Sequence, residues 1–299
     1  MRPLLETRKN CGILSAPELS HHPFHVRTRF VSRIIEIDDA TDDRLRCFAN
    51  LRSSAIRLAD SSSFIVEGRW CVQRLLESNH AILSVLTERG KEMELASLLA
   101  EEIPLYSLPS DQIRQLVGFD FHRGVLACGR RPALKDASEL RFRPHAPPVA
   151  LAALGVSEHE NLGSMIRTAT ALGIEHLLVG PKTADPFYRR SIRVSMATVF
   201  QQNLYRLDQP DRQLGELEET RNIRTIVTTL DRDATPLDAL QLDDRESILV
   251  VGNEAAGVDR QIQDLATDRV TIPMLGTDSL NVSVAAAICM YHLIGRCRC

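Results

Sequence analysis

The stretch that most constrains the fold lies close to the C-terminus, where a polar loop leads into an apolar run. The run Val282–Ile294 is long enough for about three to four helical turns. A helix that is apolar on nearly all sides is usually a buried one. The polar loop Leu275–Asn281 precedes it, so Ser279 and Asn281 are expected where unpaired N–H groups and the positive dipole end lie. The sequence therefore predicts a core helix with polar side chains at its entrance.

Two short apolar runs before this loop predict buried strands. Ile248–Val251 ends in a Gly-Asn-Glu turn, which places the carboxylate of Glu254 at the C-terminal end of the strand. Val270–Met274 contains Pro273 and opens into the polar loop. Each piece taken alone is explained by core strands, a turn and a capped helix, so only their combination carries information about function.

Strands and helices alternate through the rest of the second half of the chain. A helix is expected over Asn161–Leu172, with Asn161 as its N-cap. Further strands are expected at 149–154, 176–179 and 224–230. This alternation predicts an α/β fold with a mostly parallel sheet and a site at the C-terminal ends of its strands.

The first half predicts a smaller α/β unit of its own. Residues 34–130 alternate short strands and helices over roughly one hundred residues, a normal domain size. Residues 131–147 are rich in proline and arginine and predict a linker to a second domain at 148–299. Residues 1–33 are basic and lack periodicity. A disordered tail, an RNA-contacting arm and a targeting peptide are all compatible with them.

Composition limits the classes of partner. The net charge of −3 excludes a uniformly basic nucleic-acid binder but leaves room for a local basic face. The sequence has no apolar run long enough to cross a membrane. Seven cysteines, an odd number without C-x-x-C spacing, predict reduced thiols in a cytoplasmic protein and no metal site.

Three motifs, taken together, resemble those of the SpoU family of RNA 2'-O-ribose methyltransferases, which belong to the knotted SPOUT class. NLGSMIRTA at 161–169 resembles the first motif, GNEAAG at 252–257 the second and IPMLGTDSLNVSVA at 272–285 the third. They occur in the family's order, and the third is long and specific. The resemblance implies a trefoil-knotted C-terminal domain and a homodimer with the active site between subunits.

The N-terminal unit resembles a second part of the same family. FIVEGRWCVQRLL at 64–76 and HRGVLAC at 122–128 are similar to the opening and close of the substrate-binding domain that precedes many SpoU catalytic domains. That domain is similar to small ribosomal-protein-like RNA binders. The arginines at 44, 46, 52 and 57 are compatible with an RNA-facing stripe or with a solvated helix surface.

The cofactor implied by the resemblance is S-adenosyl-L-methionine. No G-x-G-x-x-G follows a strand, so a Rossmann-type cofactor site is not supported. The knotted family holds its cofactor in loops, largely through backbone groups. By position in the motifs, the resemblance puts these contacts at Gly252, Ile272 and Leu280, and the strand end at Thr229 and Leu230 is expected to add to the pocket.

The resemblance also implies a set of catalytic residues. Arg167 matches the arginine to which the family assigns a catalytic role. Because a guanidinium is always protonated in proteins, we expect it to grip a phosphate beside the target ribose and to stabilise the developing alkoxide. Asn161 would orient Arg167 or the RNA, and Glu254 would fix the arginine. Ser279 and Asn281 would contact RNA or position the neighbouring loop.

The predicted activity is therefore methylation of a ribose 2'-hydroxyl in RNA, with ribosomal RNA as the first choice of substrate and transfer RNA as the second. A non-catalytic RNA-binding or ribosome assembly factor on the same fold is the alternative, and an unrelated nucleotide-binding or S-adenosylmethionine-binding α/β protein is a distant third. One departure affects substrate placement. The segment Ser191–Thr198 carries Met196 and Thr198 where the family often has small residues.

Overall fold

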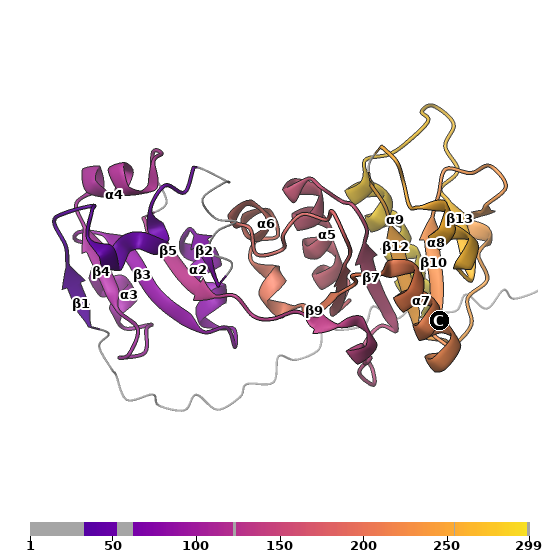
Figure 1. The fold of residues 1–299 in the computed structure, drawn as a ribbon, viewed down its shortest axis with the longest axis horizontal. Helices are drawn as coiled ribbons and strands as arrows, with labels where there is room; N and C mark the ends of the chain where they lie inside the picture. The colour runs from indigo at the N-terminus through magenta and orange to yellow at the C-terminus, as the bar shows by residue number, and fades with distance from the viewer. Residues whose placement is uncertain (1–32, 53–61, 122–123, 254, 298–299) are drawn as a thin grey trace, which may run out of the picture.

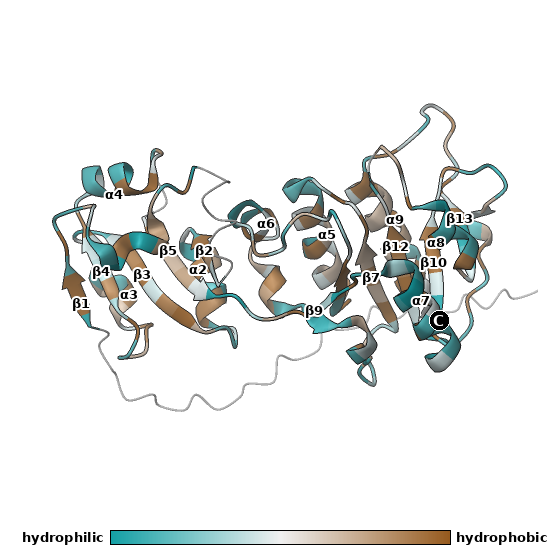
Figure 2. Ribbon diagram, in the orientation of Figure 1, coloured by the Kyte–Doolittle hydropathy of each residue, from teal (hydrophilic) through white to brown (hydrophobic). Residues whose placement is uncertain are grey.

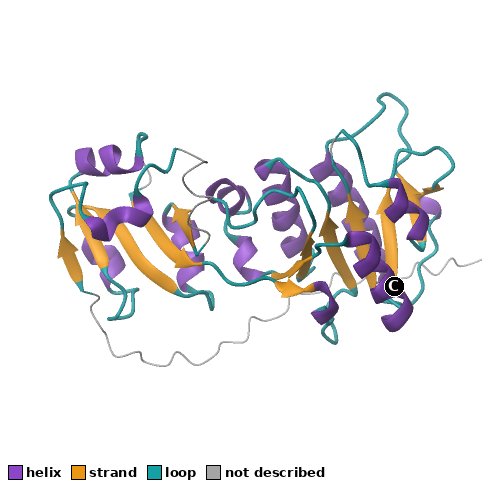
Figure 3. Cartoon of the chain, viewed as in Figure 1, coloured by secondary structure: helices purple, strands orange, loops and turns teal. Residues whose placement is uncertain are grey.

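The computed structural model describes residues 33–52, 62–121, 124–253 and 255–297. All but the last residue of the predicted basic extension 1–33 lies outside these ranges. The described chain forms two β-sheets that follow one another along the long axis of the molecule, each with helices against it (Figures 1 and 3). The two sheets confirm the α/β fold class predicted from the sequence.

The first sheet is mixed and has five strands. β1, β4 and β3 pair in parallel, and β5 pairs antiparallel with both β3 and β2. In spatial order the strands are β1 (Ile34–Glu36), β4 (Leu105–Leu108), β3 (Ile82–Glu88), β5 (Val125–Arg130) and β2 (Ser63–Glu67).

Helices cover both faces of the first sheet. On one face lie α2 (Arg69–Leu76) and α3 (Glu92–Ala96), whose apolar side chains share a core with Phe64 and Val85. On the other face lie the 3-10 helix η1 (Asp43–Phe48) and α4 (Ser110–Val117). The apolar residues of α4 recur at helical spacing, which is why one side of this helix is buried.

The second sheet has eight strands, and every pairing in it is parallel. It confirms the prediction of a mostly parallel sheet. In spatial order the strands are β11 (Thr235–Pro236), β13 (Asp268–Thr271), β10 (Arg224–Thr228), β12 (Ser247–Val251), β7 (Val149–Ala153), β8 (His176–Val179), β9 (Asn203–Arg206) and β6 (Lys135–Asp136).

The central strands of this sheet are buried on both faces. Alternate residues of β7 and β12 point into two different cores. α5 (His159–Ala171) and α9 (Val282–Cys297) supply side chains to one core, and α7 (Pro210–Arg221) and α8 (Arg260–Leu265) supply them to the other. Figure 2 shows the resulting contrast between brown central strands and the largely teal surface of α7. This double burial explains why β7 and β12 read as continuous apolar runs in the sequence.

Three short elements complete the second half of the chain. α6 (Arg189–Val194) and the 3-10 helix η3 (Thr198–Gln201) follow β8, and the 3-10 helix η4 (Leu237–Ala239) follows β11. Within the predicted linker 131–147, β6 and the 3-10 helix η2 (Ala137–Glu139) join the edge of the second sheet. The exact division into domains stays a prediction.

Two local predictions differ from the structure. α5 begins at His159 with Glu158 as its N-cap residue, so the prediction that Asn161 caps this helix is wrong. The helix starts two residues earlier than the apolar pattern indicated, because polar residues can occupy the first turn of a helix. The strand expected over Val270–Met274 is β13, which ends before Pro273, a residue that has no N–H to donate to a ladder.

No helix in the described part of the chain is long and apolar enough to cross a lipid bilayer.

Candidate active site

A pocket lies at the C-terminal ends of β10, β12 and β13, against the start of α9. Its volume is about 980 Å³, including the part open to solvent. All five residues predicted to hold the cofactor line it, together with Ser279. The cofactor-contacting candidates in its wall are Gly252, Ile272, Leu280, Thr229 and Leu230. The structure thus brings these positions together, and their binding role stays a prediction.

The pocket wall after β12 is a tight turn in which only glycine fits at position 252, because neighbouring backbone atoms leave no space for a Cβ atom. A Cβ atom on Gly252 would lie 2.2 Å from the carbonyl carbon of Gly257 and 2.4 Å from the backbone nitrogen of Val258. These are backbone atoms, so no side chain can move aside to make room. The turn closes because Asn253 and Gly257 exchange two backbone hydrogen bonds, of 3.0 and 2.9 Å.

Asn253 holds this turn in place, a role that the sequence analysis did not assign. Its Nδ2 donates to the carbonyl of Gly155 over 2.8 Å, and its Oδ1 accepts from the N–H groups of Ala255 and Ala256 at 2.9 and 3.0 Å. An asparagine within a Gly-Asn-Glu-Ala-Ala-Gly stretch that follows a buried strand favours such a side-chain turn. That signal was present in the sequence. The carboxylate of the next residue, Glu254, lies outside the described residues.

The entrance of α9 is tied to α5 by two asparagines. Asn281 Oδ1 accepts from the N–H of Ser283 at 2.9 Å, and its backbone carbonyl accepts from two further N–H groups of the first turn. Asn281 therefore caps α9, whereas the sequence placed both Ser279 and Asn281 at this entrance without choosing between them. Its Nδ2 donates to Asn161 Oδ1 at 3.0 Å, across 120 positions of sequence. Asn161, although not a helix cap, is thus joined directly to the pocket wall.

Arg167 projects from the same helix as Asn161 and is exposed to solvent. Next to Asn161, Gly163 allows α5 to lie close to α6, since a Cβ there would meet Val194 Cβ at 2.8 Å and the Ser191 carbonyl at 2.9 Å. Arg167 does not line the pocket itself. Its exposed guanidinium is free to bind a phosphate of an RNA that approaches from solvent.

His159, the first residue of α5, packs against an aromatic ring. Its ring centroid lies 4.1 Å from that of Tyr188, and partial burial lowers its pKa from the usual value of 6.5. The ring is therefore held mainly in the neutral form at pH 7. The contact joins the first turn of α5 to the residue before α6.

Charges at one end of the pocket are paired. Asp231 lines the pocket and accepts from Arg260 at 2.9 Å and from Arg269 at 3.0 Å. Arg269 also reaches Asp233, whose pKa it lowers. The pairing leaves this rim near electrical neutrality. Among the described residues, no group of three His, Cys, Asp or Glu side chains is placed to hold a metal ion.

Three of the five predicted catalytic residues come together at the entrance of α9. Asn161 and Asn281 are hydrogen-bonded to each other, and Ser279, two residues before Asn281, lines the pocket. Arg167 lies on α5, six residues beyond Asn161, and Glu254 lies outside the described residues. Sequence reasoning missed the lining residues Asp231, Asn253, Val258, Gln263 and Met274. Of these, only Asn253 carried a recognisable local signal.

Known RNA methyltransferases are similar to this chain in sequence. A family model described as the SpoU rRNA Methylase family matches residues 148–291. An uncharacterised tRNA/rRNA methyltransferase of Mycobacterium tuberculosis is 35% identical over 264 residues, which cover 86% of this chain and 90% of that protein. The 23S rRNA (guanosine(2553)-2'-O)-methyltransferase RlmP of Bacillus subtilis is 28% identical over 87% of this chain and 99% of its own length.

Solved structures share the fold over most of the chain. The AdoMet-bound rRNA methyltransferase of Sinorhizobium meliloti matches with a TM-score of 0.75 over 88% of this chain and 98% of that one, at 21% identity. The SpoU methyltransferase AviRb of Streptomyces viridochromogenes, in complex with AdoMet, matches with a TM-score of 0.71 over 86% of this chain and 98% of that one, at 23% identity. The described chain therefore has the α/β fold of the knotted methyltransferases.

Proposed function

Because the chain belongs to the SpoU rRNA methylase family, we propose that it transfers the methyl group of S-adenosyl-L-methionine to a ribose 2'-hydroxyl of RNA. The observation that carries the proposal is the pocket lined by all five predicted cofactor positions, next to the Asn161–Asn281 hydrogen bond. Ribosomal RNA is the proposed substrate, supported by relatives named as 23S rRNA methyltransferases. Transfer RNA is the second choice, since other relatives are named tRNA/rRNA methyltransferases.

The pocket fits the proposed cofactor in the chemistry of its lining. Ile272, Val258 and Leu280 offer apolar surface for a purine ring, and the turn at Gly252 brings backbone groups to the surface of the pocket. When bound, S-adenosyl-L-methionine supplies an electrophilic methyl group on its sulfonium.

The protein residues then act on the ribose. We propose that Arg167 holds the phosphate beside the target nucleotide through charge-assisted hydrogen bonds and stabilises the alkoxide that develops on the 2'-oxygen. The guanidinium stays protonated, so the proton of the hydroxyl passes to that phosphate or to water. Asn161 and Asn281 position the start of α5 and the loop with Ser279 relative to each other. Glu254 is retained as the proposed partner of Arg167.

We further propose that the enzyme is a homodimer formed through α9. Val284, Ile288 and Tyr291 are 47, 40 and 71% exposed. Their spacing places them on one side of the helix. The adjoining groove is largely apolar and is also lined by Leu237 and Pro273. An apolar helix stripe next to an apolar groove on the same surface suits a two-fold contact between identical copies.

The N-terminal part of the chain, residues 34–130, is proposed to bind the RNA substrate. The proposal is supported by exposed side chains whose chemistry suits RNA. Trp70, the single tryptophan of the chain, is 71% exposed at the start of α2 and offers a face on which an unpaired base can stack. Arg46 and Arg52 are exposed as well, whereas Arg44 is exposed but ion-paired with Asp42. Arg57 of the predicted stripe lies outside the described residues.

A cytoplasmic location is proposed on the basis of the cysteines. They are seven in number and none has C-x-x-C spacing, and Cys289 is a free, buried thiol in the structure, as is usual in a reducing compartment.

The test combines cofactor binding with methyl transfer. The purified protein is titrated with S-adenosyl-L-methionine by calorimetry, and transfer of labelled methyl groups to ribosomal and transfer RNA is then measured for the wild type and Arg167→Ala. Cofactor binding with Arg167-dependent label in one RNA pool is the expected result. Absence of cofactor binding would overturn the proposal and favour a non-catalytic RNA-binding factor.

A further inference from the structure

Residues 187–201 lie between the first sheet and the active-site helix α5. They contain α6 and η3, and both elements contact α5. α6 also contacts β2, and η3 contacts α2 (Figure 1). This segment therefore touches the proposed RNA-binding part and the proposed catalytic part at the same time. It includes the stretch Ser191–Thr198 that departs from the family pattern.

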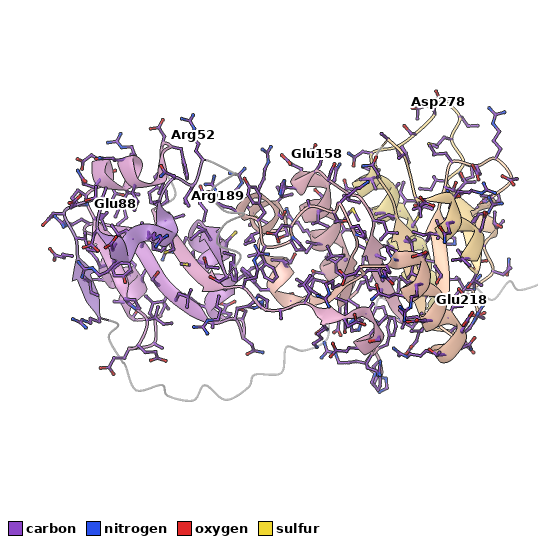
Figure 4. The ribbon with its side chains drawn as sticks, in the orientation of Figure 1. Arg52, Glu88, Glu158, Arg189, Glu218 and Asp278 are labelled. Atoms are coloured by element: carbon purple, nitrogen blue, oxygen red, sulfur yellow. The ribbon has the colours of Figure 1, made fainter. Side chains whose placement is uncertain are left out.

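The centre of the contact is a largely buried ion pair. Arg189 Nη1 donates to Glu67 Oε2 at 2.7 Å, and the side chains are 20% and 6% exposed. The same guanidinium donates to the Leu51 carbonyl at 3.4 Å and lies 4.5 Å from the ring centroid of Phe119. Three separate segments of the N-terminal part thus hold one arginine of α6. Figure 4 shows Arg189 between the first sheet and α5. A buried charge pair tolerates little displacement, because either charge alone would be left without compensation.

Aromatic rings pack beside this ion pair. Phe64 of β2 lies 5.1 Å from Phe187 and 5.5 Å from Phe200, measured between ring centroids. His80 lies 5.1 Å from Phe200 and 5.9 Å from Phe187. Two rings from each part of the chain therefore form one cluster. Domains connected by small polar contacts move relative to each other, whereas an apolar interface of this kind restricts such motion.

The C-terminal side of α6 is held in an unusual backbone conformation. Met196 and Ala197 have φ angles of 54° and 61°, in the left-handed region that residues other than glycine seldom adopt. The Met196 carbonyl accepts from Arg74 of α2 at 2.5 Å, and Ala197 N–H donates to Ile192 at 2.7 Å. Such a conformation persists only where the surrounding structure imposes it. Here one of the imposing contacts comes from the N-terminal part.

On its other side, α6 is fixed to α5. The two helices approach closely at Gly163, and Arg190 forms an ion pair with Glu160 in the first turn of α5. Asn161 is the next residue. The contacts from Glu67 to Arg189 and from Arg190 to Glu160 therefore join β2 to the start of the helix that carries Arg167. Figure 4 shows Arg52, Glu158 and Asp278 along the same upper edge of the molecule.

We propose that this contact makes Arg189 a positioning residue, which fixes the distance between the RNA held by the N-terminal domain and Arg167 and thereby selects the nucleotide that is methylated. The inference rests on the proposed function. An RNA whose recognition element and target nucleotide are separated by the matching span presents its 2'-hydroxyl to the pocket, and neighbouring nucleotides do not. Loosening the contact broadens the set of positions methylated and leaves the pocket intact.

The first experiment measures shape without RNA. Small-angle scattering of the full-length protein is compared for the wild type, Glu67→Gln and Arg74→Met. The first variant removes the negative charge opposite Arg189, the second removes the donor to the Met196 carbonyl, and both retain side-chain size. Glu216→Gln is the matched control, because its ion pair with Arg212 lies on the exposed surface of α7. We expect a larger radius of gyration in the two contact variants only. Profiles identical to that of the wild type in both contact variants would overturn the inference, whatever the methylation assay gives.

The second experiment measures selectivity. Methylated positions are mapped in the substrate RNA by the resistance of 2'-O-methylated linkages to alkaline cleavage, with kcat, KM and cofactor affinity measured in parallel. We expect Glu67→Gln and Arg74→Met to lower kcat/KM for RNA at least tenfold and to spread label to adjacent nucleotides. Cofactor affinity should stay within twofold, and the exchange variant Glu67→Arg with Arg189→Glu should recover the single position.

Two results separate the inference from the proposed function. A wild type that transfers no methyl group to any RNA refutes the proposed function, while the scattering comparison still decides whether the contact is rigid. Variants that methylate the same single nucleotide as the wild type, with losses in rate and stability alone, would make the contact merely structural and overturn the positioning role.

Discussion

Replacing Gly252 by alanine tests the pocket most sharply, because the structure gives the contacts that one methyl group would make. The Cβ atom would start 2.2 Å from the Gly257 carbonyl carbon, whereas 3.4 Å is an ordinary contact. Gly252 is not among the glycines with positive φ. Backbone strain at residue 252 therefore adds nothing, and the whole effect comes from the contact with the turn.

The loss of stability and of cofactor affinity expected for Gly252→Ala follows from the contacts that the turn would lose. Moving Gly257 away breaks the two hydrogen bonds that it exchanges with Asn253, worth about 1 kcal/mol each in net stability. Overpacking a tight site costs a further ~1–3 kcal/mol. The displaced atoms form the pocket wall, so we expect the cofactor Kd to rise at least tenfold, which corresponds to about 1.4 kcal/mol.

The assay pairs calorimetric titration with thermal unfolding, each with and without S-adenosyl-L-methionine. At a cofactor concentration one hundred times its Kd, the wild type should gain about 2.7 kcal/mol of stability. Gly252→Ala should gain far less at the same concentration. Gly215→Ala is the control, since a Cβ on Gly215 of α7 meets no atom within 4 Å. A Gly252→Ala protein with wild-type cofactor affinity would refute the assignment of the pocket.

Four further outcomes are expected. Arg167→Ala should abolish methyl transfer and leave cofactor affinity and dimerisation unchanged, as measured by label transfer, calorimetry and sedimentation; loss of cofactor binding would contradict its role. Asn281→Asp keeps the acceptor that caps α9 but loses the donor to Asn161, so methyl transfer should fall at least tenfold with little change in melting temperature, whereas Asn281→Ala should also lose about 1 kcal/mol of stability. Tyr291→Glu places a charge on the apolar stripe of α9 and should convert the dimer to monomer in sedimentation at micromolar concentration; an unchanged dimer would exclude this face. Burial lowers the pKa of His159, so its neutral form lends stability that is complete above pH 6.5 and is lost as the pH falls towards the lowered folded value. The decline in unfolding free energy between pH 7 and 5.5 should therefore be smaller in His159→Gln, and an equal decline would argue against the contribution of this ring.

The sequence predicted five of the eight strands of the second sheet and did not predict β6, β9 or β11, which are short or lie towards its edges. The two central strands were the clearest. β7 and β12 are buried on both faces, so they appear as continuous apolar runs that end in glycine or polar turns. The entrance of α9 was also located correctly, since Ser279 and Asn281 are both of capping type and precede an apolar run, and the structure gives the cap to Asn281. In both places the local pattern and the tertiary environment require the same residues.

The remaining features depend on contacts between distant segments. No local pattern indicates that Asn161 accepts from Asn281, and its capping type pointed to the wrong role. Likewise, Met196 was noticed only as a departure from small residues, whereas the structure places its carbonyl opposite Arg74 of the other part of the chain. The pairing of Arg189 with Glu67 joins positions 122 residues apart, and each residue alone looks like an ordinary surface charge.

The order in which the pocket is synthesised has a consequence for the nascent chain. Every residue that lines the pocket lies between Thr228 and Ala285, and the cap of α9 closes it against α5. A nascent chain cannot complete this wall until residue 285 has left the ribosome. The helix that bears Arg167 is synthesised much earlier, and its Asn161 pairs with a residue 120 positions later in the sequence. Such long-range closure makes folding slow, and it makes the cofactor a ligand only of a chain in which α9 has docked against α5.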